Sequence, residues 1–225
     1  MGVPRTVAIM QPYFAPYAGY FRLIAAADLF VVYDCVQFPR RGWVHRNRFP
    51  RADGSLDWLT LPLAKAPRDV LIRDLAFRAG AAQAFARQIG RFPALAGTGP
   101  DSPLSHALRD LTVTPLAYLV RLLGMCCALL RFPFAPVSSS SMGVPPGLHG
   151  TERILEIARR AGASRYLNAP GGRELYRSAD FSAAGVELRF LRPYDGPAQS
   201  ILPRLLTESP AAVREEILAR CDLEA

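Results

Sequence analysis

Residues 34–37, with the sequence DCVQ, place a carboxylate, a thiol and an amide side by side. Cys35 is a candidate thiolate nucleophile, with His45 as its general base and Asp34 as the carboxylate that orients the histidine. Arginines that follow closely would favour the thiolate over the thiol. The pattern therefore predicts covalent chemistry at Cys35. The alternative is an inert thiol at the end of a strand.

The segment RRGWVHRNR at residues 40–48 combines arginines with an indole, an imidazole and an amide. Guanidinium groups bind phosphate, carboxylate and pyrophosphate through paired hydrogen bonds. The alternative role for the histidine is a solvated or phosphate-contacting side chain. The residues that we predict to bind substrate here are Gln37, Arg40, Trp43, Arg46, Asn47 and Arg48.

A second candidate site is the loop QPYFAPYAGY at residues 11–20. Its amide and phenol groups can donate and accept hydrogen bonds, and Gly19 permits close approach of the backbone. In open parallel sheets, ligands bind beyond the carboxyl ends of strands, where this loop would lie. The predicted binding residues are Gln11, Tyr13, Tyr17 and Tyr20. The alternative is that their rings only close the end of the sheet.

A third segment, YLNAPGG at residues 166–172, ends a short apolar run with a glycine turn. Tyr166, Asn168 and the turn amides are candidates for binding an anion or a carbonyl group. A tight turn into a helix is an equally good interpretation. The serine run at residues 138–141 lacks the context of a nucleophile elbow, so we expect a mobile surface loop over residues 137–150.

Buried strands and amphipathic helices must position these segments. Apolar runs predict strands at 6–10 and 29–33, and the helix expected at 20–27 between them makes a βαβ unit. Further strands are expected at 58–63, 70–77, 165–168 and 186–191, and helices at 81–92, 115–132, 151–161 and 210–220. These elements predict an α/β fold: a Rossmann-like open, mainly parallel sheet flanked by helices, with a helical C-terminal portion. We expect one domain over residues 1–225, with a possible helical appendage over 81–135.

Composition narrows the class of protein. Half of the 225 residues are hydrophobic, which suffices for a sizeable core. The four cysteines form no CxxC pair, so neither a metal site nor a disulfide framework is predicted. No secretory signal is recognised, and the apolar run at 116–130 is too short to cross a bilayer. These features predict a cytoplasmic protein without a membrane association.

The formal net charge is +8, and all but one of the Lys and Arg side chains are arginines. A genome rich in G and C would produce this bias without any function. The functional interpretation is that a basic surface recruits an acidic partner, such as an acyl carrier protein, or a phosphate-bearing substrate. No nucleic-acid-binding module is recognisable, so we do not expect nucleic acid as the partner.

The ordered series IMQPYFAPYAGYF, FVVYDCVQF, RRGWVHRNR, WLTLP and GTERILEIARRAGASRYLNAPGGRELY resembles the WbqC-like protein family, from residue 8 to about residue 195. The resemblance implies an enzyme of sugar or natural-product biosynthesis, a group often labelled as glycine or aminoacyl transferases. Two positions depart from the usual pattern. Cys35 stands where the family commonly has an acidic or small polar residue, and His45 where it often has asparagine.

A more distant likeness concerns nucleotidylyltransferases. The string P-x-x-G-Y at a strand-to-helix turn resembles their HxGH loop, and the serine run resembles their ISST segment. Tyr17 and Tyr20 stand in the histidine positions. The missing histidines argue against nucleotidyl transfer and are compatible with a related Rossmann-like fold.

The leading functional prediction is an acyl- or aminoacyl-transferring enzyme that takes its acyl group from a thioester on a carrier protein or coenzyme A. An amine would accept the group, and an amine within the acyl chain would make the enzyme a cyclase. In this scheme Gln11, Tyr13 or Asn168 binds the thioester oxygen. No cofactor is expected beyond the phosphopantetheine or coenzyme A of the donor. The alternatives are direct N-acylation of a nucleotide-linked amino sugar and a non-catalytic binding protein for an acidic partner.

Overall fold

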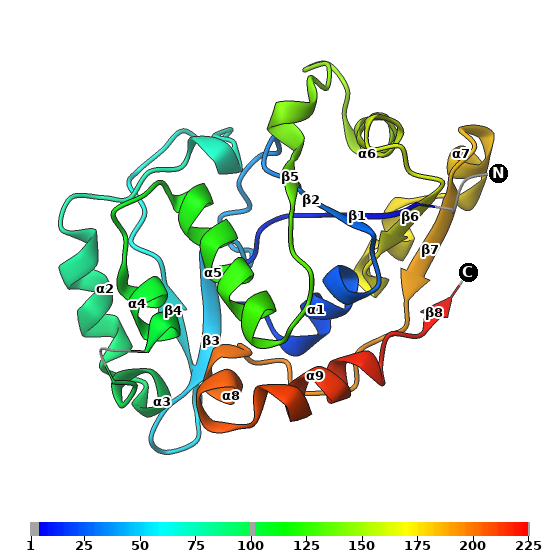
Figure 1. Ribbon diagram of the computed structural model, residues 1–225. Helices are drawn as coiled ribbons and strands as arrows, with labels where there is room; N and C mark the ends of the chain where they lie inside the picture. Colours follow the sequence, from blue (N-terminus) through cyan, green and yellow to red (C-terminus); the bar gives the residue numbers. More distant parts are fainter. Residues whose placement is uncertain (1–4, 100–101, 225) are drawn as a thin grey trace.

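Six strands form one sheet in the order β5-β2-β1-β6-β7-β8 in a computed structural model that describes residues 5–99 and 102–224 (Figure 1). Neighbouring strands are parallel throughout, except that the last strand runs antiparallel to β7. The strands are β1 (Thr6–Met10), β2 (Leu29–Val32), β5 (Val137–Ser138), β6 (Arg165–Asn168), β7 (Glu187–Leu191) and β8 (Leu223–Glu224).

Both faces of the sheet are covered, which explains why β1 and β2 are nearly continuous apolar runs. In β1 the side chains alternate: Val7 and Ile9 pack on one face and Ala8 on the other. The face that holds Ala8 is covered by α1 (Ala18–Ala25), α5 (Pro115–Leu129), α8 (Leu202–Thr207) and α9 (Pro210–Leu218). The opposite face is covered by α6 (Gly150–Arg160) and α7 (Ser178–Ala183).

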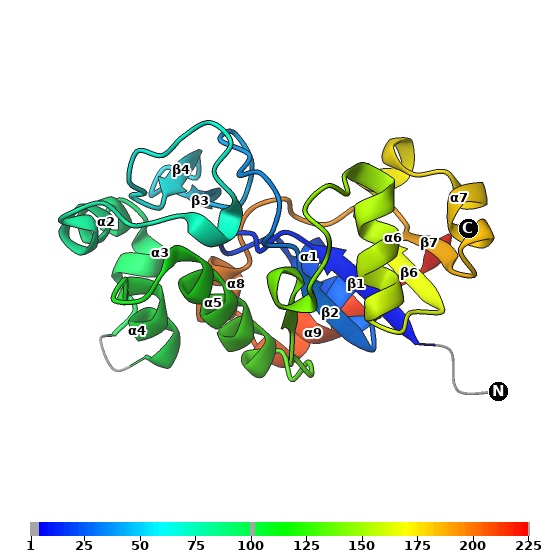
Figure 2. The same cartoon turned by 90° about the horizontal axis from the view of Figure 1, so that it is seen from above.

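The remaining elements lie beyond the carboxyl ends of the parallel strands (Figures 1 and 2). They are the antiparallel pair β3 (Arg46–Pro50) and β4 (Leu56–Thr60), with the helices α2 (Ala81–Ile89), α3 (Pro93–Ala96) and α4 (Pro103–Arg109). Their apolar side chains, such as Phe49 and Phe85, belong to the same buried cluster as Ala8 of the sheet. This part of the chain therefore forms a wall at the edge where ligands of open sheets bind.

The predicted fold class is confirmed, including the parallel βαβ unit at the N-terminus and the helical C-terminal portion. Residues 81–135 are largely helical as expected. One domain over residues 1–225, with or without an appendage over 81–135, stays a prediction.

Two of the predictions made from the sequence differ from the structure. Residues 70–77 form a 3₁₀ helix (Ile72–Asp74) instead of a strand. The flanking residues make only isolated antiparallel bridges, Leu71 with Gln37 and Phe77 with Leu63, so no ladder of strand pairs develops. The loop expected over residues 137–150 is replaced in its first part by β5 and a 3₁₀ helix (Ser139–Met142), and residues 143–149 belong to no helix or strand, as expected. The pairing of β5 with β2 fixes the serine run beside the end of β2.

Candidate functional site

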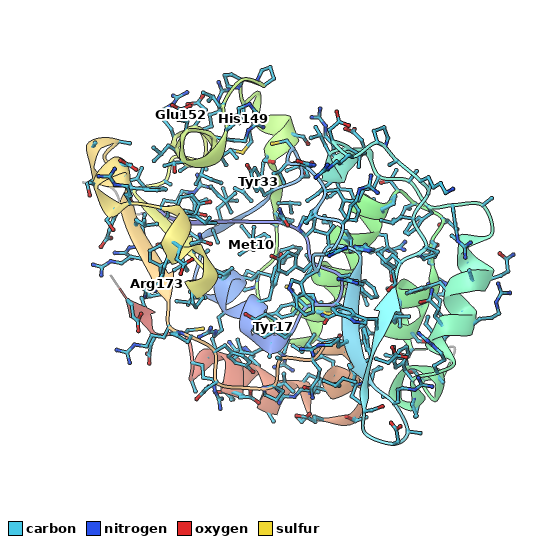
Figure 3. All side chains as sticks on the ribbon, turned by 180° about the vertical axis from the view of Figure 1, so that it is seen from behind. Met10, Tyr17, Tyr33, His149, Glu152 and Arg173 are labelled. Carbon is cyan, nitrogen blue, oxygen red and sulfur yellow. The ribbon has the colours of Figure 1, made fainter. Side chains whose placement is uncertain are left out.

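Two cavities open at the carboxyl edge of the sheet, on either side of the ends of β1 and β2. The chain leaves β1 through α1 on one face and leaves β6 through α7 on the other, so the switch point of the sheet lies between β1 and β6. Figure 3 shows Tyr33 between His149 and Met10, with Tyr17 beyond Met10. The backbone nitrogen of Tyr33 donates to the carbonyl of Met10 at 2.8 Å, so adjacent strand ends separate the cavities.

The first cavity, here called the cysteine cavity, has a volume of about 450 Å³ and contains Cys35 in its wall. It lies between the end of β2, the serine run and the start of α6. Its lining comprises Tyr33, Cys35, Val36, Gln37, Leu71, Arg73, Ser139, Ser140, Gly143, Val144, Pro146, His149, Gly150 and Arg153. Segments that are far apart in the sequence therefore meet around one half-buried thiol.

Asp34 is completely buried, and the serine run satisfies its carboxylate. Ser139 Oγ donates to Oδ1 at 2.7 Å, Ser140 N to the same oxygen at 2.8 Å, and Ser140 Oγ to Oδ2 at 2.5 Å. Ser139 Oγ also accepts from the backbone nitrogen of Asp34 at 3.1 Å and lies 3.1 Å from the sulfur of Cys35. A buried carboxylate requires such donors. These hydrogen bonds hold Asp34 in place and thereby fix the backbone position of Cys35, the next residue.

Arg153 brings a buried positive charge to the thiol. Its Nη1 lies 3.2 Å from the Cys35 sulfur and also donates to the Cys35 carbonyl at 3.2 Å. Its other hydrogen bonds go to the carbonyls of residues 145, 146 and 148. The Arg153 side chain is buried, yet no carboxylate within residues 5–99 and 102–224 forms an ion pair with its guanidinium. The sulfur is thus the group beside Arg153 that can carry a negative charge.

The predicted triad of Cys35, His45 and Asp34 is not formed. Both carboxylate oxygens of Asp34 are taken by the serines, and His45 is absent from the lining of the cysteine cavity. His45 packs edge-to-face on Phe38 with ring centroids 5.0 Å apart, and its Nδ1 is buried without a hydrogen-bond partner among the described residues. Burial, and then the charge of Arg46, lower the pKa of His45 to about 4. The histidine that shares the cavity with Cys35 is His149, which is exposed at the N-cap of α6.

The second cavity, here called the tyrosine cavity, lies at the switch point and has a volume of about 500 Å³. Six of the predicted binding residues line it: Tyr13, Tyr17, Tyr20, Trp43, Asn47 and Arg48. Other walls come from Met10, Pro16, Gly19, Leu23, Ala169, Pro170, Gly171, Leu191, Pro193, Tyr194, Gly196 and Ala198. The tyrosine loop and part of the basic segment therefore meet in one cavity at this edge, whereas Cys35 lines the other cavity.

Asn47 and Gly19 explain how the tyrosine loop holds its shape. The buried amide of Asn47 donates to the carbonyls of Ala15 at 2.7 Å and Phe14 at 3.3 Å. A Cβ at Gly19 would lie 2.8 Å from Cγ of Tyr194 and closer still to the ring of Tyr17. The absence of a side chain at position 19 therefore allows both rings to lie directly against α1.

The phenols of the tyrosine cavity are neutral donors and acceptors. Burial raises the pKa of Tyr13, with a smaller contribution from Tyr17, and burial also raises the pKa of Tyr17. The pKa of Tyr20 is raised well above its usual value by complete burial. Its hydroxyl donates to the backbone carbonyl of Gln11 at 2.8 Å. The Tyr13 and Tyr17 hydroxyls can therefore orient a ligand by hydrogen bonds, whereas the Tyr20 hydroxyl is engaged with the backbone.

Other predicted site residues have structural contacts. The Gln37 amide lines the cysteine cavity and donates to the carbonyl of Arg68, and Arg40 donates to the carbonyls of residues 66 and 67. Arg46 lies over the ring of Trp58 at 4.2 Å. Tyr166 is buried on the opposite face of the sheet, stacked on Phe181 with centroids 5.4 Å apart, so it lines neither cavity.

The predicted roles for the thioester oxygen do not fit the geometry at Cys35. Tyr13 lines the tyrosine cavity, Gln11 lines neither cavity, and the Asn168 amide is buried. Asn168 Oδ1 accepts from the backbone of Ala169, and a Cβ at Gly172 would lie 2.9 Å from Asn168 Cγ. Asn168 therefore packs into its own glycine turn.

Sequence reasoning missed Ser139, Ser140, His149 and Arg153. The likeness of the serine run to the ISST segment was the available signal for the serines. Nothing in the local sequence marked the arginine, which reads as one of several cations on an amphipathic helix. Its partner lies 118 residues earlier in the chain.

Two features are absent from residues 5–99 and 102–224. No group of three or more His, Cys, Asp or Glu side chains is placed to hold a metal ion. No helix there has the length and apolar character required to cross a bilayer.

Comparison with known proteins identifies relatives without assigning a reaction. The model of the WbqC-like protein family matches residues 11–200. An uncharacterized protein of Mycobacterium tuberculosis, Rv1507c, is 28% identical over 208 residues, which cover 85% of this chain and 84% of that protein. No solved structure gave a significant match.

Proposed function

The chain belongs to the WbqC-like protein family, and from this premise we propose that it is an acyl- or aminoacyl-transferring enzyme acting through a thioester on Cys35. One observation carries the proposal: the buried Arg153 guanidinium has no carboxylate partner among the described residues and lies 3.2 Å from the Cys35 sulfur. The guanidinium holds the sulfur in place from inside the cavity wall and faces the position where a nucleophilic sulfur would react.

In the first step the thiolate attacks the carbonyl carbon of the donor thioester. The new bond joins Cys35 sulfur to the acyl carbon, and the bond to the pantetheine sulfur breaks. The pantetheine leaves as a thiolate that takes up a proton. Gly150, the first residue of α6, lines the same cavity, so the free amides of the helix start are suited to bind the oxyanion.

In the second step an amine attacks the Cys35 thioester. The carbon–nitrogen bond forms, the bond to Cys35 sulfur breaks, and the amine loses a proton. His149 replaces His45 as our candidate for the base, because it lines the cavity of Cys35 and its side chain is exposed to solvent. An amine carried by the acyl group itself would give a cyclic product by the same two steps.

The donor in this proposal is carried by an acidic carrier protein or by coenzyme A. Residues 36–78 carry nine Arg and Lys side chains against four Asp. Arg73 and Gln37 of this segment line the cysteine cavity. The excess of positive charge in this segment, one of whose arginines lines the cavity, supports docking of an acidic partner whose pantetheine arm enters toward Cys35.

Intact mass spectrometry tests the proposal. The wild type and Cys35→Ser would each be mixed with a panel of acyl and aminoacyl carrier-protein thioesters and coenzyme A thioesters. We expect a mass gain of one acyl group on the wild type alone. A matched pair, His149→Asn and His45→Asn, separates the two histidines: the first should accumulate the adduct in the presence of an amine, and the second should turn over.

Two outcomes would replace the covalent scheme. Loss of the acyl group from the carrier, without an adduct and undiminished in Cys35→Ser, would establish direct transfer to the amine. Stable binding of the carrier protein with no acyl loss from any donor would indicate a non-catalytic binding protein.

A further inference from the structure

We infer that the tyrosine cavity is a binding site for a nucleoside phosphate. This ligand class goes beyond the chemistry at Cys35 and does not depend on it, because the two cavities share none of their lining residues. The inference rests on the walls of the cavity, on its charge and on its position in the sheet.

Five aromatic side chains from the described part of the chain line the cavity. Tyr13 and Tyr20 lie with centroids 5.4 Å apart, and Tyr17 and Tyr194 with centroids 5.5 Å apart. Trp43 adds an indole that is partly open to solvent. Flat, partly polar rings of this kind bind planar bases and sugar rings by stacking and by hydrogen bonds from their hydroxyls.

The cavity carries a single charge, and its sign is positive. Arg48 is the one charged side chain in the lining formed by described residues. Its Nε is buried and has no hydrogen-bond acceptor in residues 5–99 and 102–224. A buried N–H without an acceptor is costly, and a guanidinium binds phosphate through paired hydrogen bonds. A ligand with an anionic group would supply the missing acceptor.

Position and size favour a nucleotide over a small aromatic acid. The cavity lies at the switch point of the sheet, between residues that follow β1 and β6, where open α/β sheets bind nucleotides. A volume of about 500 Å³ falls within the range of cavities that enclose ligands of several rings. Figure 3 shows Met10 and Tyr17 of this lining on the opposite side of Tyr33 from His149.

Tryptophan fluorescence gives a direct test, because the only two tryptophans of the chain are Trp43 in the cavity and Trp58. Their rings lie 5.4 Å apart. The wild type would be titrated with adenosine and uridine monophosphates, UDP, the two parent nucleosides, inorganic phosphate and benzoate. We expect a saturable change with at least one nucleotide, and an affinity at least about tenfold above that of its nucleoside.

Arg48→Met should weaken nucleotide binding at least about tenfold and leave nucleoside binding nearly unchanged. Arg51→Met is the matched control from the same hairpin, because Arg51 is exposed and pairs with Asp57 at 3.0 Å. Cys35→Ser should bind as the wild type does, which separates this site from the proposed transfer reaction. Calorimetry would confirm each affinity.

The inference would be overturned by nucleosides that bind as tightly as their phosphates, by binding of benzoate in preference to nucleotides, or by the lack of a saturable signal with any nucleotide. Equal weakening by Arg48→Met and Arg51→Met would also count against it, because nonspecific attraction to a basic surface would then suffice.

Discussion

Ser139 Oγ lies 2.7 Å from Oδ1 of Asp34, although the two residues are 105 positions apart in the chain. This hydrogen bond joins the end of β2 to the end of β5 beneath the thiol of Cys35. The hydroxyl therefore serves the buried carboxylate and the orientation of the neighbouring sulfur together.

Ser139→Ala should destabilise the protein by about 1–3 kcal/mol, because it removes a donor from a buried carboxylate. Urea denaturation measures the free energy of unfolding. Ser141→Ala is the matched control: Ser141 is exposed and donates only to the carbonyl of Ser138, so a change within about 0.5 kcal/mol is expected. Equal effects of the two substitutions would refute the role given to Ser139.

Arg153→Met should slow alkylation of Cys35 by iodoacetamide severalfold, because it removes the guanidinium that contacts the sulfur at 3.2 Å and orients it toward the cavity. Peptide mass spectrometry distinguishes Cys35 from the other three cysteines. Arg160→Met is the control on the same helix, where Arg160 pairs with Glu156 at 2.5 Å. It should leave the rate of Cys35 alkylation unchanged. A folded Arg153→Met protein with the wild-type rate would contradict the prediction.

His45 should make stability depend on pH. Its pKa falls from 6.5 to about 4 on folding, first through burial and then through Arg46. The unfolded chain therefore binds the proton more tightly, so this contribution is complete above about pH 6.5 and is lost as the pH falls toward 4. The Tm of His45→Asn should decline less than that of the wild type on acidification. His106→Asn, at an exposed site on α4, should decline as the wild type does. Parallel declines of all three would disprove the assignment.

Gly172→Ala should destabilise the fold by about 1–3 kcal/mol, because the new Cβ would meet the buried Asn168 side chain. Its neighbour offers a close comparison. A Cβ at Gly171 meets nothing within 4 Å, so Gly171→Ala should stay within about 0.5 kcal/mol of the wild type. Thermal and urea unfolding measure both. Similar stabilities would show that the glycine turn accommodates a side chain at either position.

The sheet and the edge that carries the cavities were predictable because they depend on local patterns. Two apolar runs around a short helix predict parallel strands, whose carboxyl ends share one edge. The tyrosine loop and Cys35 each follow one of these strands, so their placement at that edge follows from strand direction.

The partners of Cys35 were not predictable because they depend on packing over long distances in sequence. His45 is ten residues from Cys35, yet its ring packs on Phe38 away from the cysteine cavity. The serine run looked like a solvated loop, and its pairing beside β2 depends on the register of β5. In the sequence Arg153 is one cation among several on its helix, and only the packing of α6 on the sheet places it beside Cys35.

The order of synthesis gives the arrangement around Cys35 a consequence for the nascent chain. β1, α1 and β2 leave the ribosome long before the residues that contact the thiol, since Ser139 and Arg153 follow Cys35 by 104 and 118 positions. Until β5 adds to β2 and α6 covers the sheet, the sulfur has neither a guanidinium nor a hydroxyl beside it. The hydrogen-bond partners of this thiol therefore reach it only after residue 153 has been made and α6 has packed on the sheet.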